Sequence, residues 1–177
     1  MNNSTVTKPF EWDSPTSLEE LLNAVLEIKD FPDHLARALK GVKDPIRSIS
    51  YREDGWTLTQ LVHHLADAHL NAFVRTKHLV TADAKEIQPF NQDAWSNTPD
   101  AHLPFESSVV MLLGIHQRWS LLLLECLKKP ADYLARTLWH PEYKRDISLS
   151  DFIRLYAWHG RHHLAQIEKI TGSEGAD

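Results

Sequence analysis

The 177-residue chain has very little cysteine, with Cys126 as its one thiol. A single thiol cannot form a disulfide within the chain, so the protein suits a reducing compartment. It also cannot build a structural zinc site from several thiolates. The apolar setting of Cys126, LLLLECLKK, predicts a buried and unreactive thiol rather than a nucleophile.

The chain also lacks a long apolar run and an excess of basic residues. Its purely apolar stretches are far shorter than the roughly 20 residues that span a bilayer, and its polar start, MNNSTVTKPFEWDSP, shows no secretion signal. We therefore expect a cytoplasmic protein without membrane contact. The net charge of -5 gives no reason to expect nucleic acid as a partner.

Glycine is scarce too, with 6 residues, and the prolines fall mostly between periodic segments. Hydrophobic residues make up 42% of the chain and charged residues 24%, which is the balance of a soluble globular protein. The length suits one core, so we expect a single domain over residues 1–177.

Four stretches show the apolar periodicity of amphipathic helices. Three of them begin with a capping box, in which a hydroxyl residue is followed three positions later by an acidic or amide side chain. These pairs are Ser17 with Glu20, Thr57 with Gln60, and Ser148 with Asp151. The predicted helices span about residues 17–41, with a break or kink at Pro32, then about 57–80, 105–129 and 148–172.

Two connections differ from these helices. Residues 81–106 hold three prolines and little periodicity, and a connection of that length is expected to pack over another part of the fold. Residues 133–149 alternate around a proline and predict either a small hairpin or an irregular loop. The predicted fold is all-α, a four-helix bundle of up-down-up-down type, with the hairpin between the third and fourth helices.

The last predicted helix carries three histidines within YAWHGRHHLAQI, residues 156–167. Helical residues advance by about 100° each, so His159 and His163 lie about 40° apart on the apolar face. Arg161 lies on the opposite side, and His162 lies near the edge. Imidazoles at i and i+4 can chelate one metal ion, or they can be core histidines that hydrogen-bond to neighbours.

The second predicted helix adds further histidines in WTLTQLVHHLADAHL. His64 lies at one rim of its apolar arc, His69 lies at the other rim, and His63 points further outward. His64 is the better third ligand, although the angles do not exclude His69. Asp67, one turn after His64, could orient an imidazole. Three imidazoles would leave an open position for water or a substrate atom, as catalytic metal sites do.

Other residues near this cluster have two interpretations each. His159 is followed by Gly160 and not by the glutamate of a zincin protease, so Gly160 instead predicts a close approach between helices. His116 in IHQRW either lines the pocket or packs in the core. His140 and Glu142 in WHPEY lie in a loop that could reach the metal, where either could act as a general base.

The chain resembles the DinB/YfiT-like superfamily and, within it, the YfiT-like metal-dependent hydrolases, which are related to bacillithiol S-transferases. The resemblance is densest in residues 51–73, 94–104 and 155–167 and in the strings HQRW and WHPEY. It implies a helical bundle with one divalent ion, Zn²⁺ or Ni²⁺, held by three histidines. The matching positions are His64, His159 and His163, and the resemblance also implies a homodimer.

The expected function is therefore metal-dependent hydrolysis of a small-molecule substrate. The first alternative keeps the metal but transfers a low-molecular-weight thiol. A second alternative is a non-catalytic metal-binding or stress-response bundle, in which surplus histidines such as His34, His78 and His102 form a loose metal buffer. The third is a purely structural bundle with hydrogen-bonded core histidines.

Overall fold

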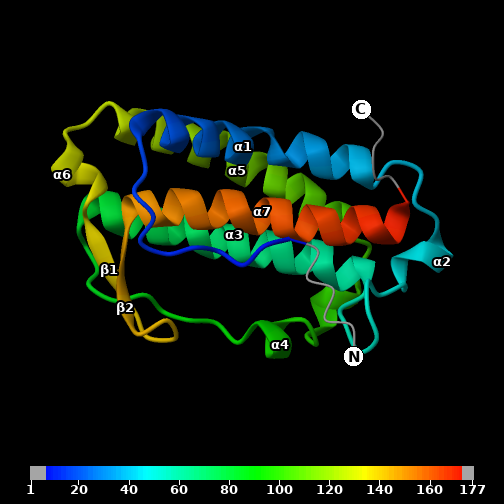
Figure 1. Ribbon diagram of the computed structural model, residues 1–177. Helices are drawn as coiled ribbons and strands as arrows, with labels where there is room; N and C mark the ends of the chain where they lie inside the picture. Colours follow the sequence, from blue (N-terminus) through cyan, green and yellow to red (C-terminus); the bar gives the residue numbers. More distant parts are fainter. Residues whose placement is uncertain (1–6, 173–177) are drawn as a thin grey trace.

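The computed structural model describes residues 7–172, and its core is a bundle of four long helices (Figure 1). The long helices are α1 (Leu18–Ala38), α3 (Leu58–Thr81), α5 (Glu106–Leu127) and α7 (Leu149–Thr171). The short elements are α2 (Asp44–Arg47), α4 (Gln92–Trp95), the 3-10 helix η1 (Pro99–His102), α6 (Ala131–Leu134), β1 (Thr137–His140) and β2 (Arg145–Ser148). The prediction of an all-α four-helix bundle is confirmed.

The helices begin where the capping boxes predict. The side chains of Ser17, Thr57 and Ser148 each accept a hydrogen bond from the backbone N–H three residues later. Each box satisfies backbone donors that the first helical turn leaves unpaired. At the other end of the chain, α7 stops at Gly172, whose φ of 70° suits a residue without Cβ.

The direction of α5 differs from the prediction. His63 of α3 contacts Ser108 near the start of α5, with 2.7 Å between His63 Nδ1 and Ser108 Oγ. Further along both helices, Trp119 Nε1 donates to Thr76 Oγ1 at 2.9 Å. The contact later in α3 is also the one later in α5, so α3 and α5 run parallel. The expected up-down-up-down order is therefore wrong. The order is up-down-down-up, with both α1 and α3 packed against α5 and α7.

The long connection between α3 and α5 explains this order. It carries the chain back along the bundle, so that α5 starts at the same end as α3 (Figure 1). On the way, the N–H of Ile87 donates to the carbonyl of Trp139 in β1 at 2.9 Å, and Ile87 is buried. The expectation that residues 81–106 pack over the fold is confirmed.

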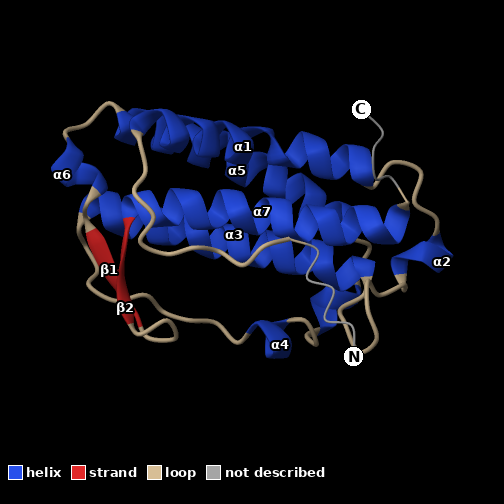
Figure 2. Cartoon of the chain, in the orientation of Figure 1, coloured by secondary structure: helices blue, strands red, loops and turns tan. Residues whose placement is uncertain are grey.

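The segment between α5 and α7 forms the hairpin and not an irregular loop (Figure 2). Strands β1 and β2 pair antiparallel, with Leu138 opposite Ile147. Both of these side chains are buried against the bundle, while their neighbours in the strands face outward. The hairpin therefore fixes the turn that follows His140 to one end of the bundle.

The sequence predicted a break or a kink at Pro32, and helix α1 continues through this residue without a break. Proline has no N–H, and its position therefore leaves the carbonyl of Ile28, four residues earlier, without its usual helical donor. That carbonyl instead accepts a hydrogen bond from His116 Nδ1 of α5 at 2.5 Å. The proline thus opens a backbone acceptor to a side chain from the neighbouring helix.

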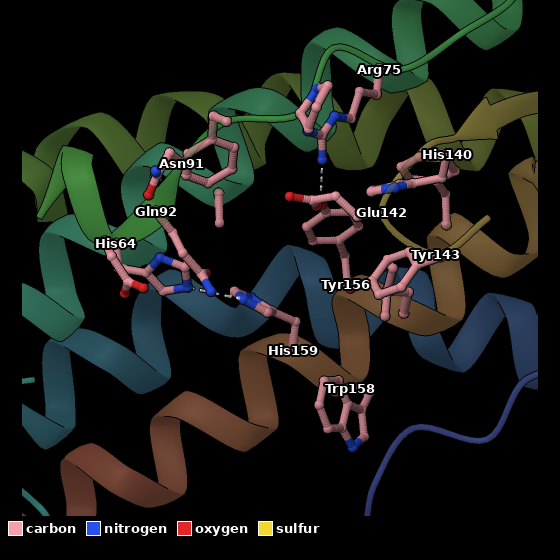
Figure 3. Close-up of a pocket in the computed structure, with 16 residues that line it drawn as sticks. His64, Arg75, Asn91, Gln92, His140, Glu142, Tyr143, Tyr156, Trp158 and His159 are labelled. Carbon is pink, nitrogen blue, oxygen red and sulfur yellow. Dashed lines mark hydrogen bonds between the residues drawn. The ribbon is translucent and has the colours of Figure 1, made fainter. Parts of the chain in front are cut away.

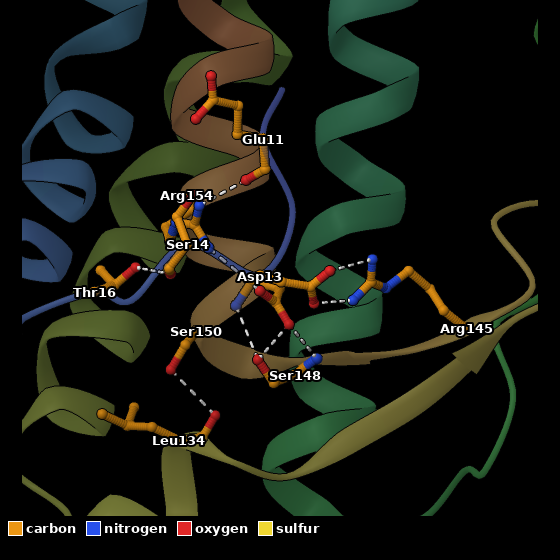
Figure 4. Close-up of polar contacts among 10 residues, drawn as sticks. Glu11, Asp13, Ser14, Thr16, Leu134, Arg145, Ser148, Ser150 and Arg154 are labelled. Carbon is orange, nitrogen blue, oxygen red and sulfur yellow. Dashed lines mark hydrogen bonds and ion pairs between the residues drawn. The ribbon is translucent and has the colours of Figure 1, made fainter. Parts of the chain in front are cut away.

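The segment before α1 lies along α7 and is held by two arginines (Figure 4). Arg154 of α7 donates to the carbonyl of Glu11 at 2.7 Å. Arg145 of β2 forms an ion pair with Asp13. The chain therefore covers part of α7 before it enters the bundle.

Helix α5 is, within residues 7–172, the one helix long and apolar enough to cross a membrane by length and composition, with a mean hydropathy of 1.3. It packs against α1 and α3, with Trp119 and Leu123 completely buried. Core helices of soluble proteins pass the same test, so one such helix is weak evidence for a membrane span. Cys126 lies on this helix, is buried, and has its pKa raised by burial, as expected for an unreactive thiol.

Candidate metal centre

Three histidines from two helices converge in the middle of the bundle. His64 of α3 faces His159 and His163 of α7, and one ring nitrogen from each lies within 4.8 Å of the other two. His64 Nε2 and His159 Nε2 are 3.3 Å apart. In the part of the chain that the structure describes, this is the one group of histidine, cysteine and acidic side chains close enough to hold a metal ion.

The packing of α7 against α1 explains why this part of α7 lies so deep. A Cβ added at Gly160 would come within 3.0 Å of Phe31 Cδ2 of α1. Such a distance is shorter than ordinary van der Waals contact, so a larger residue would push the helices apart. The prediction that Gly160 permits close helix approach is confirmed. The residue therefore places its neighbour His159 against the interior of the bundle.

Burial keeps the three imidazoles neutral. It lowers the pKa of His64 to about 4 and that of His163 to about 3. Burial also holds the pKa of His159 well below its usual value, with a further contribution from the nearby His163. Neutral imidazoles carry a lone pair on one nitrogen, which is the form that binds a metal ion.

A line of hydrogen bonds runs from His159 into the core. His159 Nδ1 lies 3.1 Å from His69 Nε2, and His69 Nδ1 lies 2.7 Å from His116 Nε2. The line ends where His116 Nδ1 meets the carbonyl of Ile28. It therefore connects the candidate metal centre to the acceptor that Pro32 leaves open.

The end of this line determines the proton positions along it. A carbonyl can only accept, so His116 Nδ1 must donate, and the neutral ring then accepts through Nε2. The same argument makes His69 donate through Nδ1 and accept, through Nε2, the hydrogen on His159 Nδ1. The lone pair of His159 therefore lies on Nε2, the atom that faces His64. The hydrogen bonds thus hold His159 in the tautomer that a metal ion needs.

His163 is oriented by a second set of hydrogen bonds. Its Nδ1 lies 2.7 Å from Gln166 Oε1, and the amide nitrogen of Gln166 lies 3.0 Å from His162 Nε2. His162 Nδ1 in turn contacts the hydroxyl of Thr7 at 2.5 Å. An amide oxygen can only accept, so His163 donates through Nδ1 and carries its lone pair on Nε2.

The donor set fits a divalent ion. Two nitrogens bound to zinc at about 2.0–2.1 Å with tetrahedral angles lie about 3.3–3.4 Å apart, which matches the spacing of His64 and His159. The ring of His64 packs on Trp56, with 4.5 Å between ring centroids. The expected orienting role of Asp67 is not observed, because among residues 7–172 its carboxylate makes no hydrogen bond to His64.

An open cleft of about 660 Å³ leads to this centre (Figure 3). His64 and His159 line its inner end, and the side chain of Gln92 points toward them. His140 and Glu142 line the same cleft, although His140 is the last residue of β1 and does not lie in the expected loop. His140 is buried and Glu142 is exposed. Their catalytic role stays a prediction.

A second hollow of about 430 Å³ reaches the centre from the side of His163 and Trp56. His64 and His159 line both hollows. A metal ion at the centre would therefore be accessible from two sides.

The sequence interpretation missed several residues of the centre. It left His69 as a rival ligand and gave His116 two interpretations. In the structure His69 is hydrogen-bonded to His159, and His116 is hydrogen-bonded to His69 on the side away from His159. It also placed His63 outward, but η1 and α5 bury this side chain. Arg75 was not considered, although it follows Ala72 by three residues and so shares the apolar face of its helix.

The fold and the histidine cluster define a class of helical-bundle proteins with a candidate metal centre between two helices. Residues 27–167 match the DinB superfamily model, and the chain belongs to that superfamily. The match covers α3, α5, the hairpin and most of α1 and α7, and so includes the three converging histidines.

Individual relatives agree with this assignment. A protein of Bacillus mycoides is 41% identical over 88% of both chains, and one of Geobacillus thermodenitrificans is 40% identical over 89% of this chain and 87% of its own. Their names assign both provisionally to the metal-dependent hydrolases. The structure of YfiT from Bacillus subtilis, provisionally described in the same way and with an unusual four-helix bundle topology, is 31% identical. It has a TM-score of 0.84 over 97% of this chain and 95% of YfiT.

Proposed function

We propose that the protein is a metal-dependent hydrolase of a small molecule, with one Zn²⁺ or Ni²⁺ ion held by His64, His159 and His163. The observation that carries this proposal is the convergence of three neutral imidazoles, two of which have their lone pairs directed by hydrogen bonds. A site of three nitrogen ligands leaves a coordination position open, as in catalytic zinc sites. The provisional names of the relatives support the same class.

A bound divalent ion would polarise the substrate and lower the pKa of a water molecule toward neutrality. The residues of this chain would supply the rest. His69 and Gln166 hold His159 and His163 in the required orientation. Glu142 lines the cleft and is exposed, so its carboxylate could accept the proton of the attacking water. His140 is the other candidate base, since burial lowers its pKa to about 4 and leaves its ring neutral.

Transfer of a low-molecular-weight thiol is the second candidate. The two hollows that meet at His64 and His159 would let a thiol and an electrophile approach the ion from different sides. Turnover of an electrophile with and without added thiol separates the two reactions. Turnover that requires the thiol would replace hydrolysis with transfer.

The metal is tested on protein purified without a histidine tag. We expect one equivalent of a divalent ion by elemental analysis, and its loss in the His159→Ala variant. His78→Ala is the matched control, because His78 pairs with Asp83 on the surface far along α3 and should leave the metal content unchanged. Several weakly bound ions would instead support the metal buffer, and an absence of metal would leave a structural bundle.

We also propose a cytoplasmic homodimer.

A further inference from the structure

Arg75 of α3 carries a buried positive charge beside the candidate metal centre. Only 8% of the residue is exposed, and it lines the cleft together with His64 and His159. Its guanidinium donates to Tyr156 Oη at 3.2 Å and to the carbonyl of Gln88 at 3.0 Å. Both acceptors are neutral, and its Nε has no hydrogen-bond partner in the described part of the chain.

No carboxylate forms an ion pair with Arg75 within residues 7–172. The ion pairs of that part of the chain do not include Arg75. Glu142 and Asp93 line the same cleft and are exposed, and neither forms an ion pair with Arg75. Burying a charge without a counter-charge costs several kcal/mol in proteins, so such groups usually pair or serve a ligand.

Two further polar side chains line the same cleft, and each has a hydrogen-bonding atom without a partner among the described residues. Tyr156 Oη accepts from Arg75, and among the described residues its own hydrogen has no acceptor. His140 is 4% exposed, and its Nδ1 has no hydrogen-bond partner from residues 7–172. Figure 3 shows the guanidinium of Arg75 pointing at the Tyr156 hydroxyl, with Glu142 and His140 to one side of this pair.

This group lies next to the metal centre. The rings of Tyr156 and His159 are one helical turn apart on α7, with 5.7 Å between their centroids. An anion bound at Arg75 would therefore be separated from the position of the metal by about the width of one aromatic side chain. A small substrate could reach both places at once within a cleft of about 660 Å³.

We propose that Arg75, Tyr156 and His140 form an anion-binding subsite for a carboxylate or phosphate group of the substrate. The guanidinium supplies the charge, and the Tyr156 hydroxyl and the N–H of the neutral His140 ring supply further donors. The substrate is thus an anionic small molecule whose reacting bond lies away from its charged group, toward His64 and His159. The assignment of this anion to a substrate rests on the proposed hydrolase function, whereas the binding of an anion does not.

The test is direct binding of acetate and of inorganic phosphate to the zinc-loaded protein, by calorimetry or by NMR titration. We expect Arg75→Gln to weaken binding of the preferred anion by about tenfold or more, because hydrogen bonds to charged groups are the stronger ones. Arg118→Gln, an exposed arginine on α5, is the matched control and should bind as the wild type does. The tighter of the two probes identifies the source as carboxylate or phosphate, and acetamide should not compete.

An anion that binds to the zinc ion alone would bind the wild type and Arg75→Gln equally, and this result would overturn the proposal. If Arg75→Gln fails to fold, Arg75→Lys and Tyr156→Phe give the answer, since each removes part of the donor set. Weaker anion binding in both supports the subsite, and unchanged binding in both refutes it. Zinc content is measured on the same samples, so a failure of the metal proposal is seen separately.

Discussion

At the scale of single residues, a proline in one helix is connected to a candidate metal ligand in another. Pro32 leaves the carbonyl of Ile28 without a helical donor, and His116 donates to that carbonyl. His69 in turn donates to His116, and His159 donates to His69. The three hydrogen bonds have donor–acceptor distances of 2.5, 2.7 and 3.1 Å. Their combined effect is to select one of two tautomers at His159, because the acceptor at the far end cannot donate.

His69→Phe tests this arrangement. The replacement has a similar ring but no acceptor for His159 Nδ1, so the ligand loses its orienting partner in the core. We expect zinc affinity to fall by about 10- to 100-fold, the usual effect of removing a group that orients a metal ligand. Competition with a chromophoric chelator measures the affinity, and His78→Phe on the surface is the control. Wild-type affinity in His69→Phe would mean that the hydrogen bond does not hold the ring.

At the scale of helices, the approach of α1 to α7 depends on Gly160. The Cβ of an alanine there would meet Phe31 at 3.0 Å. We expect Gly160→Ala to lower the free energy of unfolding by about 1–3 kcal/mol through overpacking. Urea unfolding gives this value, and combining the change with Phe31→Leu should recover part of the loss.

Gly114 of α5 provides the matched control, because nothing lies within 4 Å of a Cβ placed there. Gly114→Ala should stabilise the protein by about 0.5–1 kcal/mol, the difference between the two residues inside a helix. Equal effects of the two substitutions would show that helix contact does not decide the outcome at Gly160.

At the scale of the whole molecule, several buried histidines make stability depend on pH. Burial lowers the pKa of His116 and His140 to about 4, whereas the unfolded chain has the usual value of about 6.5. The unfolded state therefore binds more protons between these values. The stability that the neutral rings provide is present above about pH 6.5 and is lost as the pH falls toward 4.

We expect the free energy of unfolding to decrease over that range by at most about 1.4 kcal/mol per pH unit for each such histidine. Urea titrations at several pH values measure the slope, and His140→Gln should make it shallower. A free energy of unfolding that is constant from pH 6.5 to 5 would contradict this reasoning.

The outer face of α5 is the surface on which we expect the homodimer to form. Val110, Leu113 and Leu121 lie along this face and are 72%, 56% and 63% exposed. Apolar side chains gathered on one helix face commonly mark an interaction surface. We expect light scattering to give twice the chain mass of 20.3 kDa, and Val110→Glu with Leu121→Glu to give the monomer. A monomeric wild type would refute the dimer.

Sequence reasoning succeeded where the cause is local. Capping at Ser17, Thr57 and Ser148 depends on neighbours three residues away, and the starts of these helices were predicted correctly. The pairing of His159 with His163 on one face follows from helical geometry alone. Helical geometry also made His64 the better candidate for the third ligand. Because His64 lies only at the rim of the apolar arc, His69 remained an alternative ligand until the packing of the helices was known.

Contacts within one or two helical turns therefore set the four amphipathic helices, the capped starts of three of them, and the histidine pair on the apolar face of the last one, which is why the sequence was enough to predict them. Only the packing of the helices shows that α5 runs parallel to α3, that His69 and His116 continue the hydrogen bonds of His159 into the core, and that Arg75 is buried without an ion pair among residues 7–172. These features depend on which helix faces bury one another, and that is set by contacts between residues far apart in the chain.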